Sequence, residues 1–214
     1  MKKAQHSRTQ ARSAESRRAV IESVVNLIAE RGFASATTAA IATNAGVTWG
    51  VLQYHFGGKD GIFAAVLESS LQELLALLDQ LAPPSGDPRQ YLTAAIDVVW
   101  SYHSRPTYRA AMEILLNCSH RSEDFLELAQ RAGRSLEAAV MRILQQCNRR
   151  LAGKQARLIT EIMLGALRGF AISNALFLAH KRQYRNERAL LTEGLLALLE
   201  SGAALNCAKP STPL

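Results

Sequence analysis

The sequence lacks the apolar segments that a secreted or membrane-spanning chain needs. Its polar N-terminus has no apolar stretch of the kind found in a signal peptide. The longest nearly apolar stretch, residues 169–179, is too short to cross a bilayer and contains Ser173 and Asn174. We therefore expect a soluble, cytoplasmic protein that does not enter the membrane.

Cysteine and the familiar catalytic motifs are also scarce or missing. The 3 cysteines, Cys118, Cys147 and Cys207, are widely spaced and form no C-x-x-C. This pattern argues against a disulfide framework and against a zinc site, and Cys118 and Cys147 are interpreted as small core residues. No G-x-S-x-G, H-E-x-x-H, G-x-G-x-x-G or Walker loop is present, so we expect no enzyme activity, no cofactor and no metal.

Acidic residues are absent from the start of the chain, where none precedes Glu15. Residues 1–59 hold eight Lys and Arg against three Glu, a net charge of +5 (8 − 3), out of +7 for the whole chain. A basic arm ahead of a nearly neutral body is typical of a nucleic-acid binder, although a solvated tail has the same composition. A membrane-surface protein would have apolar residues among these cations, and the arm has almost none.

The remaining pattern is helical throughout. Runs of alternating β-branched residues are missing, and apolar residues recur at spacings of three and four, which predicts an all-α fold. Residues 82–88, with three prolines and a glycine, interrupt the chain sharply. The predicted helices cover residues 14–31, 39–45, a short stretch after the N-cap Thr48, 60–81, 89–104, 106–118, 122–151, 154–178 and 186–203.

Residues 37–56 contain the parts of a helix-turn-helix. Either Thr37 or Thr38 can N-cap the first short helix, and the small Ala45 and Gly46 allow the two helices to cross closely. The second helix, "TWGVLQYHF", has no acidic residue. At about nine residues it is roughly 13 Å long, which suits a major groove about 12 Å wide. We expect its N-terminal turn to meet base edges while the first helix crosses the DNA backbone.

Residues 37–62 closely resemble the tetracycline-repressor (TetR) family of transcription regulators. That family has a Ser/Thr cap, I-A, then A-G-V-S/T-x-G-x-L-Y-x-H-F, then K-E/D-x-L/I. The matching residues here are Thr37, Ile41, Ala42, Ala45, Gly46, Val47, Thr48, Gly50, Leu52, His55, Phe56, Lys59, Asp60 and Ile62, and Tyr54 lies one position after the family's Tyr. The resemblance implies a three-helix DNA-binding domain at residues 1–59, followed by a larger helical ligand-binding and dimerisation domain at residues 60–214.

The motif and the resemblance together predict which residues contact DNA. Leu52 and Phe56 are assigned to the core. Gln53 stands where the family usually has Tyr, and it can bond a phosphate or read an adenine edge. His55 can bond a phosphate or pack inside the domain, and Lys59 is either a phosphate contact or a solvated lysine. The predicted DNA-binding residues are Thr37, Thr38, Thr48, Trp49, Gly50, Val51, Gln53, Tyr54, His55 and Lys59.

The second domain carries no motif, so its sites are predicted from composition and from the resemblance. Aromatic and polar residues within a helical domain suit an apolar ligand pocket, although at helical spacing most such residues are simply core. The predicted pocket residues are Trp100, His103, Met112, Phe170, Asn174 and Phe177. The predicted dimer contacts, which could instead face the monomer's own core, are Gly165, Gly169, Ser173, Leu191, Leu195 and Leu198.

These features predict a homodimeric regulator that binds a palindromic operator in double-stranded DNA. The resemblance implies a repressor that an unidentified small-molecule effector releases from DNA. The alternatives are a ligand-responsive activator of the same family, an enzyme built on a helical bundle, and a basic membrane-surface protein.

Overall fold

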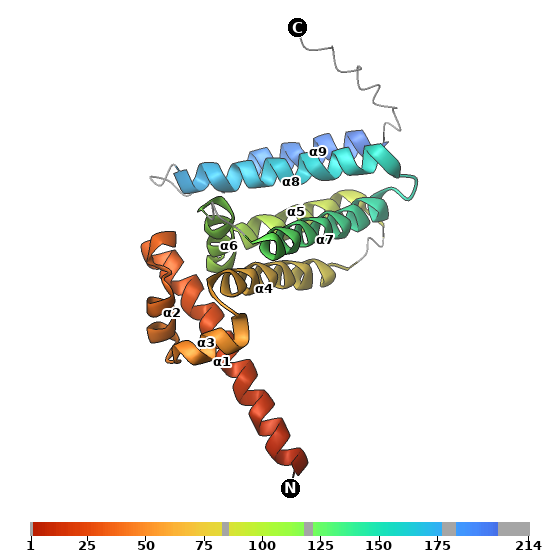
Figure 1. Cartoon of the computed structure of the whole chain (residues 1–214). Helices are drawn as coiled ribbons and strands as arrows, with labels where there is room; N and C mark the ends of the chain where they lie inside the picture. Colours follow the sequence, from red (N-terminus) through yellow and green to blue (C-terminus); the bar gives the residue numbers. More distant parts are fainter. Residues whose placement is uncertain (1, 83–85, 118–121, 177–182, 201–214) are drawn as a thin grey trace. The chain divides into compact units, whose positions relative to one another are not determined.

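A computed structural model describes residues 2–82, 86–117, 122–176 and 183–200. Within these ranges it contains α-helices and one short 3-10 helix and no β-strand, which confirms the predicted all-α class (Figure 1). The elements are α1 (Lys2–Arg31), η1 (Phe33–Ser35), α2 (Thr38–Ala45), α3 (Trp49–Phe56), α4 (Lys59–Asp79), α5 (Pro88–His103), α6 (Pro106–Asn117), α7 (Glu123–Cys147), α8 (Gly153–Leu176) and α9 (Arg185–Glu200).

The start of α1 is the largest difference from the predicted helix boundaries. The helix begins at Lys2 and not at residue 14, and its first turns project beyond α2 and α3 (Figure 1). Residues 2–13 have no apolar stripe, but they contain no Gly or Pro either, so helix propensity alone favours continuation. Gly32 ends α1 as predicted, since its φ is 78° and its N–H donates to the Ile28 carbonyl at 2.9 Å.

The chain packs as two units, each with its own core. The first unit comprises Met1–Ala76 and Tyr102–Arg134, and the second comprises Leu77–Ser101 and Ser135–Leu214. Helix α6 and the first half of α7 therefore pack with the N-terminal helices. The functional boundary predicted after residue 59 stays a prediction.

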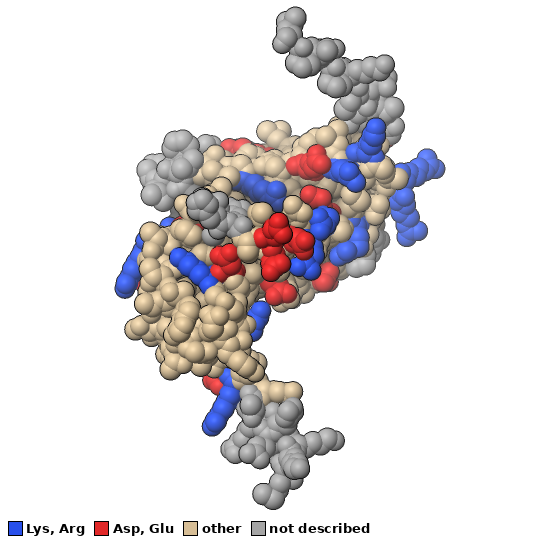
Figure 2. Space-filling model, viewed as in Figure 1, with Lys and Arg blue, Asp and Glu red and all other residues tan. Residues whose placement is uncertain are grey.

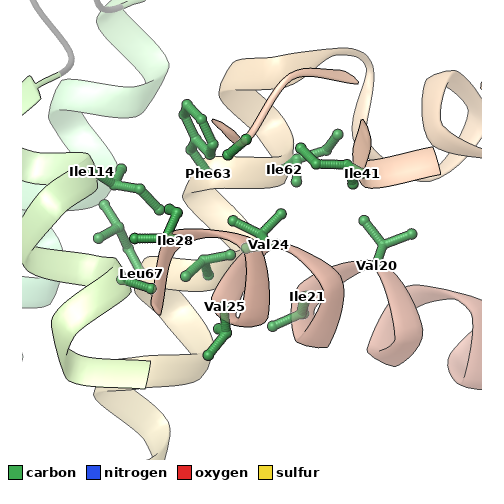
Figure 3. Packing of buried hydrophobic residues seen from close by; sticks show 14 of the residues in the cluster. Val20, Ile21, Val24, Val25, Ile28, Ile41, Ile62, Phe63, Leu67 and Ile114 are labelled. Atoms are coloured by element: carbon green, nitrogen blue, oxygen red, sulfur yellow. The ribbon is translucent and has the colours of Figure 1, made fainter. Parts of the chain in front are cut away.

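The core of the first unit joins α1, α2, α3, α4 and α6 (Figure 3). The apolar stripe predicted along α1 is buried there, and Val20, Val24 and Ile28 are completely enclosed. Ile41 from α2 and Leu52 from α3 lie in the same cluster and are also fully buried. Because the helix-turn-helix has only one buried side chain in each short helix, its geometry depends on what α1, α4 and α6 supply.

The core of the second unit joins apolar faces of α5, α7, α8 and α9. The backbone at the end of α9 receives two side-chain hydrogen bonds, from Asn148 to the Leu199 carbonyl and from Gln155 to the Leu198 carbonyl. These bonds place the end of α9 next to the α7–α8 turn. The buried residues include Leu92, Ile96, Val99, Val140, Leu144, Ile159, Met163, Leu167, Leu195 and Leu199.

One helix in the described part of the chain, α4, is long and apolar enough to cross a membrane by length and composition alone. Its Ile62, Phe63, Val66 and Leu67 are buried in the first unit's core. A core helix of a folded domain passes the same test, so this is weak evidence for a membrane span.

Candidate nucleic-acid interface

Both helices of the helix-turn-helix begin at a threonine cap. The Thr37 hydroxyl accepts the Ala40 N–H at 3.2 Å, and the Thr48 hydroxyl accepts the Val51 N–H at 3.4 Å. Thr37 is thus the N-cap of α2 and Thr38 is its first residue. Gly46, at φ 65°, ends α2 with a left-handed turn that a side chain would strain. Three local signals, Thr37, Thr48 and Gly46, therefore fix where α2 and α3 begin and where α2 ends.

Helix α3 presents an uncharged face to solvent. The Tyr54 side chain is 84% exposed and Trp49 is 53% exposed, values that are unusual for aromatic residues. Thr48, Gly50 and Gln53 are exposed as well. On the side shown in Figure 2, the surface over α2 and α3 is largely free of Lys, Arg, Asp and Glu. Such a face offers hydrogen bonds and aromatic contact without repelling phosphates.

Two predicted contacts in α3 are less accessible than the others. Val51 is half-buried, and Leu52 beside it is fully buried, as predicted. His55 is also half-buried, with its ring edge-on to Tyr54 at 5.0 Å and to Phe56 at 6.2 Å between centroids. This position leaves both predicted roles of His55 open.

Gln53, which replaces the tyrosine usual in the family, bonds within its own helix. Its Nε2 donates to the Gly57 carbonyl at 3.1 Å, close to the C-terminal end of α3. This bond uses one of the two amide N–H donors, so the other donor and the carbonyl oxygen are available to a phosphate or a base. No pattern in the sequence predicts this local bond.

Lys59 lies at the start of α4, against aromatic rings. Its Nζ is 5.7 Å from the Phe33 ring centroid and 5.2 Å from that of Phe63, and the two rings are themselves 5.4 Å apart. Both distances are within the range of a cation–π contact. Lys59 remains exposed, so the same ammonium group can also face a phosphate.

Arg17 has a similar position in α1, and its role was not predicted individually. Its guanidinium lies 5.8 Å from the Phe56 ring centroid and 3.4 Å from a carboxylate oxygen of Glu68. Arg17 therefore connects α1 to the end of α3 and to α4. In the sequence, Arg17 is recognisable only as one of the cations of the basic arm.

The predicted ligand-pocket residues are divided between the two units. His103 and Met112 belong to the first unit, whereas Trp100, Phe170 and Asn174 belong to the second. Trp100 is buried, and the other four are half-buried. Phe177 lies outside the described residues.

Trp100 and Phe170 meet around Tyr184, a residue the sequence did not single out. The Tyr184 ring stacks on Phe170 at 5.1 Å and meets the edge of Trp100 at 5.5 Å. The Arg188 guanidinium lies 5.6 Å from the Trp100 ring centroid and pairs with Asp97. An arginine thus already occupies one face of this aromatic cluster.

Within the described residues, two cavities lie elsewhere, and neither is lined by any of the six predicted pocket residues. The larger, of about 620 Å³, lies in the first unit between the α3–α4 turn and the start of α7, with Phe56, Asp60 and Phe125 among its lining residues. The smaller, of about 110 Å³, lies in the second unit beside Leu78, Tyr91 and Ile143.

The residues predicted at the dimer interface differ in their exposure. Gly165 and Gly169 are exposed, and a Cβ added to either would meet no heavy atom within 4 Å. Leu195, in contrast, is buried in the core of its own unit. Ser173, Leu191 and Leu198 are half-buried. Periodicity placed the leucines of α9 on one stripe but could not tell which of them face the monomer's own core.

Sequence comparison identifies the N-terminal segment. Residues 20–66 match the family described as "Bacterial regulatory proteins, tetR family", and the match spans the last part of α1, α2, α3 and the start of α4. The HTH-type transcriptional regulator BetI of Stenotrophomonas maltophilia is 29% identical over 161 residues, covering 75% of this chain and 81% of that protein. The similarity therefore extends beyond the helix-turn-helix.

Solved structures share the fold. A TetR transcription regulator from Haloarcula marismortui superposes with a TM-score of 0.71 at 17% identity, over 87% of this chain and 100% of that one. The multidrug binding protein EbrR, complexed with imidazole, gives a TM-score of 0.60 at 19% identity, over 88% of this chain and 97% of that one. The motif, the family match over residues 20–66 and the similarity to BetI together support a helix-turn-helix transcriptional regulator of the TetR family, and the solved structures show that the chain shares the fold.

Proposed function

We propose that this protein is a homodimeric repressor that reads a palindromic operator through α3 and leaves it when a small molecule binds. The observation that carries the proposal is the exposed, uncharged face of α3, with Trp49 and Tyr54 extended into solvent. Exposing two large aromatic side chains is unfavourable unless they meet a partner. The proposal also places the protein in the cytoplasm, where its DNA lies.

The dimensions of α3 support insertion into the major groove. Its 8 residues span about 12 Å, close to the groove's width of about 12 Å. Thr48 and Trp49 lie in its first turn, which is the part of a recognition helix that meets base edges. Thr37, at the N-terminus of α2, is placed to bond the DNA backbone, and the thymine methyl is a suitable apolar partner for Trp49.

An exposed face of α8 supports the homodimer. Ile162, Gly165, Gly169 and Ile172 are all exposed and lie at i, i+3, i+7 and i+10, so they share one side of the helix. Small residues between apolar ones allow a second helix to approach closely. Two copies related by twofold symmetry would present two α3 helices to the two halves of a palindrome.

The aromatic cluster of the second unit supports a ligand site. Trp100, Phe170 and Tyr184 form an aromatic surface, and the charged Arg188 lies against Trp100. Half-buried Asn174, one turn of α8 beyond Phe170, adds a group able to bond a polar part of a ligand. EbrR, of the same fold, is described as a multidrug binding protein and was solved with imidazole.

The experiment that tests the proposal is selection of bound duplexes from a random 30-base-pair library, followed by fluorescence anisotropy. We expect an inverted repeat to be enriched and bound at least about a thousandfold more tightly than random DNA. Sedimentation of the complex should give two chains per site. Enrichment of no sequence would contradict specific binding, and a single chain on an asymmetric site would contradict the dimer.

The sign of regulation needs a separate measurement. A reporter placed behind the selected sequence should be silenced when the protein is expressed. Increased reporter output would assign the protein as an activator.

A further inference from the structure

A carboxylate from α6 bonds the backbone that leads into the helix-turn-helix. Oε2 of Glu113 accepts the Phe33 N–H at 2.8 Å, across 80 positions of the sequence. The bond is partly buried, and the side chain of Glu113 is mostly enclosed, at 24% exposed. A charged acceptor in such surroundings forms a stronger bond than a neutral one.

The second oxygen of Glu113 is held by its own helix. Nε of Arg109 donates to Oε1 at 3.2 Å from one turn earlier in α6. The Arg109 bond fixes the direction of the carboxylate. Helix α6 is itself fixed, because Ala110, Ala111 and Ile114 are buried in the same core as α1 (Figure 3).

The bonded N–H begins a short chain of backbone contacts that ends at α2. Phe33 is the first residue of η1, and the residue before it, Gly32, has no side chain that could cap this element. Within η1 the Ala36 N–H donates to the Phe33 carbonyl at 3.1 Å, and the Thr37 N–H donates to the Ser35 carbonyl at 2.8 Å. Thr37 then caps α2, so four residues separate the Glu113 bond from the start of that helix.

A second contact holds the middle of α2. The buried hydroxyl of Ser23, in α1, donates to the Ile41 carbonyl at 3.1 Å. A rigid helix needs two fixed points to set its direction. Ser23 supplies one, and the Glu113 bond, through η1, supplies the other at the end of α2 that faces the DNA backbone.

We propose that Glu113 is a positioning residue for DNA binding: from α6 it caps η1 and thereby fixes the N-terminal end of α2 against the DNA backbone. This inference rests on the proposed function, since it assumes that α2 contacts phosphates when α3 lies in the groove. Glu113 touches no DNA itself. It acts through Phe33 and Thr37.

The test compares Glu113→Ala, Glu113→Gln and Arg109→Ala with wild type on the selected duplex, at a temperature where each variant is fully folded. Glu113→Ala should weaken binding about tenfold, because a charged acceptor of a partly buried N–H is lost. Glu113→Gln keeps an acceptor and should stay within about threefold of wild type. Arg109→Ala should lie between the two. Leu116→Ala, on the same helix and 71% exposed, is the matched control and should bind as wild type does.

Amide hydrogen exchange separates positioning from a general loss of stability. In Glu113→Ala and Arg109→Ala the Phe33 amide should exchange faster, while the amide of the core residue Leu52 keeps its protection. The inference would be overturned if Glu113→Ala bound the duplex as tightly as wild type. It would also be overturned if the amides of Phe33 and Leu52 both exchanged faster in Glu113→Ala. If Glu113→Ala does not fold, Arg109→Ala decides by the same two readouts. Failure of wild type to bind any duplex would instead refute the proposed function.

Discussion

Gly61 is the residue whose replacement most directly tests how α3 is fixed to α4. A Cβ built on Gly61 would lie 1.8 Å from the Phe56 carbonyl oxygen and 2.9 Å from the carbonyl carbon. Real Cβ atoms essentially never approach another heavy atom within 3.0 Å. Because both atoms are backbone, no side-chain rotation relieves the contact. Gly61→Ala must therefore displace the end of α3 from the first turn of α4 by about 1 Å.

Two effects of opposite sign decide the stability of Gly61→Ala. Alanine favours a helix over glycine by about 1 kcal/mol. Forcing a methyl group into occupied space costs about 1–3 kcal/mol, and more when backbone has to move. We expect the steric term to dominate and the free energy of unfolding to fall by about 1–2 kcal/mol. Affinity for the selected duplex should fall about tenfold as α3 shifts, which corresponds to about 1.4 kcal/mol.

Urea unfolding and fluorescence anisotropy measure the two effects, with Gly133→Ala as the matched control. Gly133 lies inside α7, and a Cβ there would meet no heavy atom within 4 Å. Gly133→Ala should therefore raise the unfolding free energy by about 0.5–1 kcal/mol and leave DNA binding unchanged. If Gly61→Ala were stabilised to the same extent as Gly133→Ala, the close approach of Phe56 to α4 would be refuted.

Four further substitutions test other parts of the molecule. Trp49→Ala should weaken binding to the selected duplex by about 1–3 kcal/mol but leave random DNA unaffected; equal losses on both would assign Trp49 to the backbone. Lys59→Ala should lower the log–log salt slope of the dimer by about 2; an unchanged slope with reduced stability would restrict Lys59 to its aromatic contacts. Gly169→Leu should give monomers by sedimentation while the chain stays folded, because the position is open; a persistent dimer would place the interface elsewhere. Burial raises the pKa of Tyr102 from 10.0 to about 12. The free energy of unfolding should therefore fall by up to about 2.7 kcal/mol as the pH rises from 10 to 12. Tyr102→Phe should remove that loss, which urea unfolding at pH 9 and pH 11 would measure.

Local signals in the sequence predicted the helix-turn-helix well. Thr48, Gly32 and Gly46 each act through their own backbone neighbours, so their effects can be predicted without knowing the fold. The stripe along α1 is similarly local, because a helix that buries Val20 and Val24 must also turn Ile28 inward.

What the sequence could not reveal depends on contacts between distant residues. The bond from Phe33 to Glu113 joins positions with no shared pattern, so no spacing rule finds it. The burial of Leu195 depends on the direction from which α8 and α7 approach α9, and an amphipathic stripe does not specify that direction. The early start of α1 was missed for another reason: a helix without an apolar face shows no periodicity.

The two short helices of the motif are held by different longer helices. Helix α4 fixes the end of α3 through the close approach at Gly61, and α6 bonds the chain ahead of α2 through Glu113. If α4 and α6 could separate, the angle between α2 and α3 would change.

Three contacts oppose such a separation. Glu73 of α4 accepts the Thr107 hydroxyl at 2.6 Å and pairs with Arg105, at the junction of α5 and α6. Nearby, the hydroxyl groups of Ser70 in α4 and Tyr102 in α5 form a buried hydrogen bond. The helix-turn-helix should therefore move together with α4 and α6 as one body. Under the proposed function, an effector would then release DNA by changing the spacing of the two α3 helices in the dimer, and the geometry within each motif would be retained. The test is to add an effector and to measure amide exchange across α2 and α3 together with operator affinity. Unchanged exchange with a fall in affinity would agree with this mechanism. Faster exchange confined to α2 and α3 would contradict it.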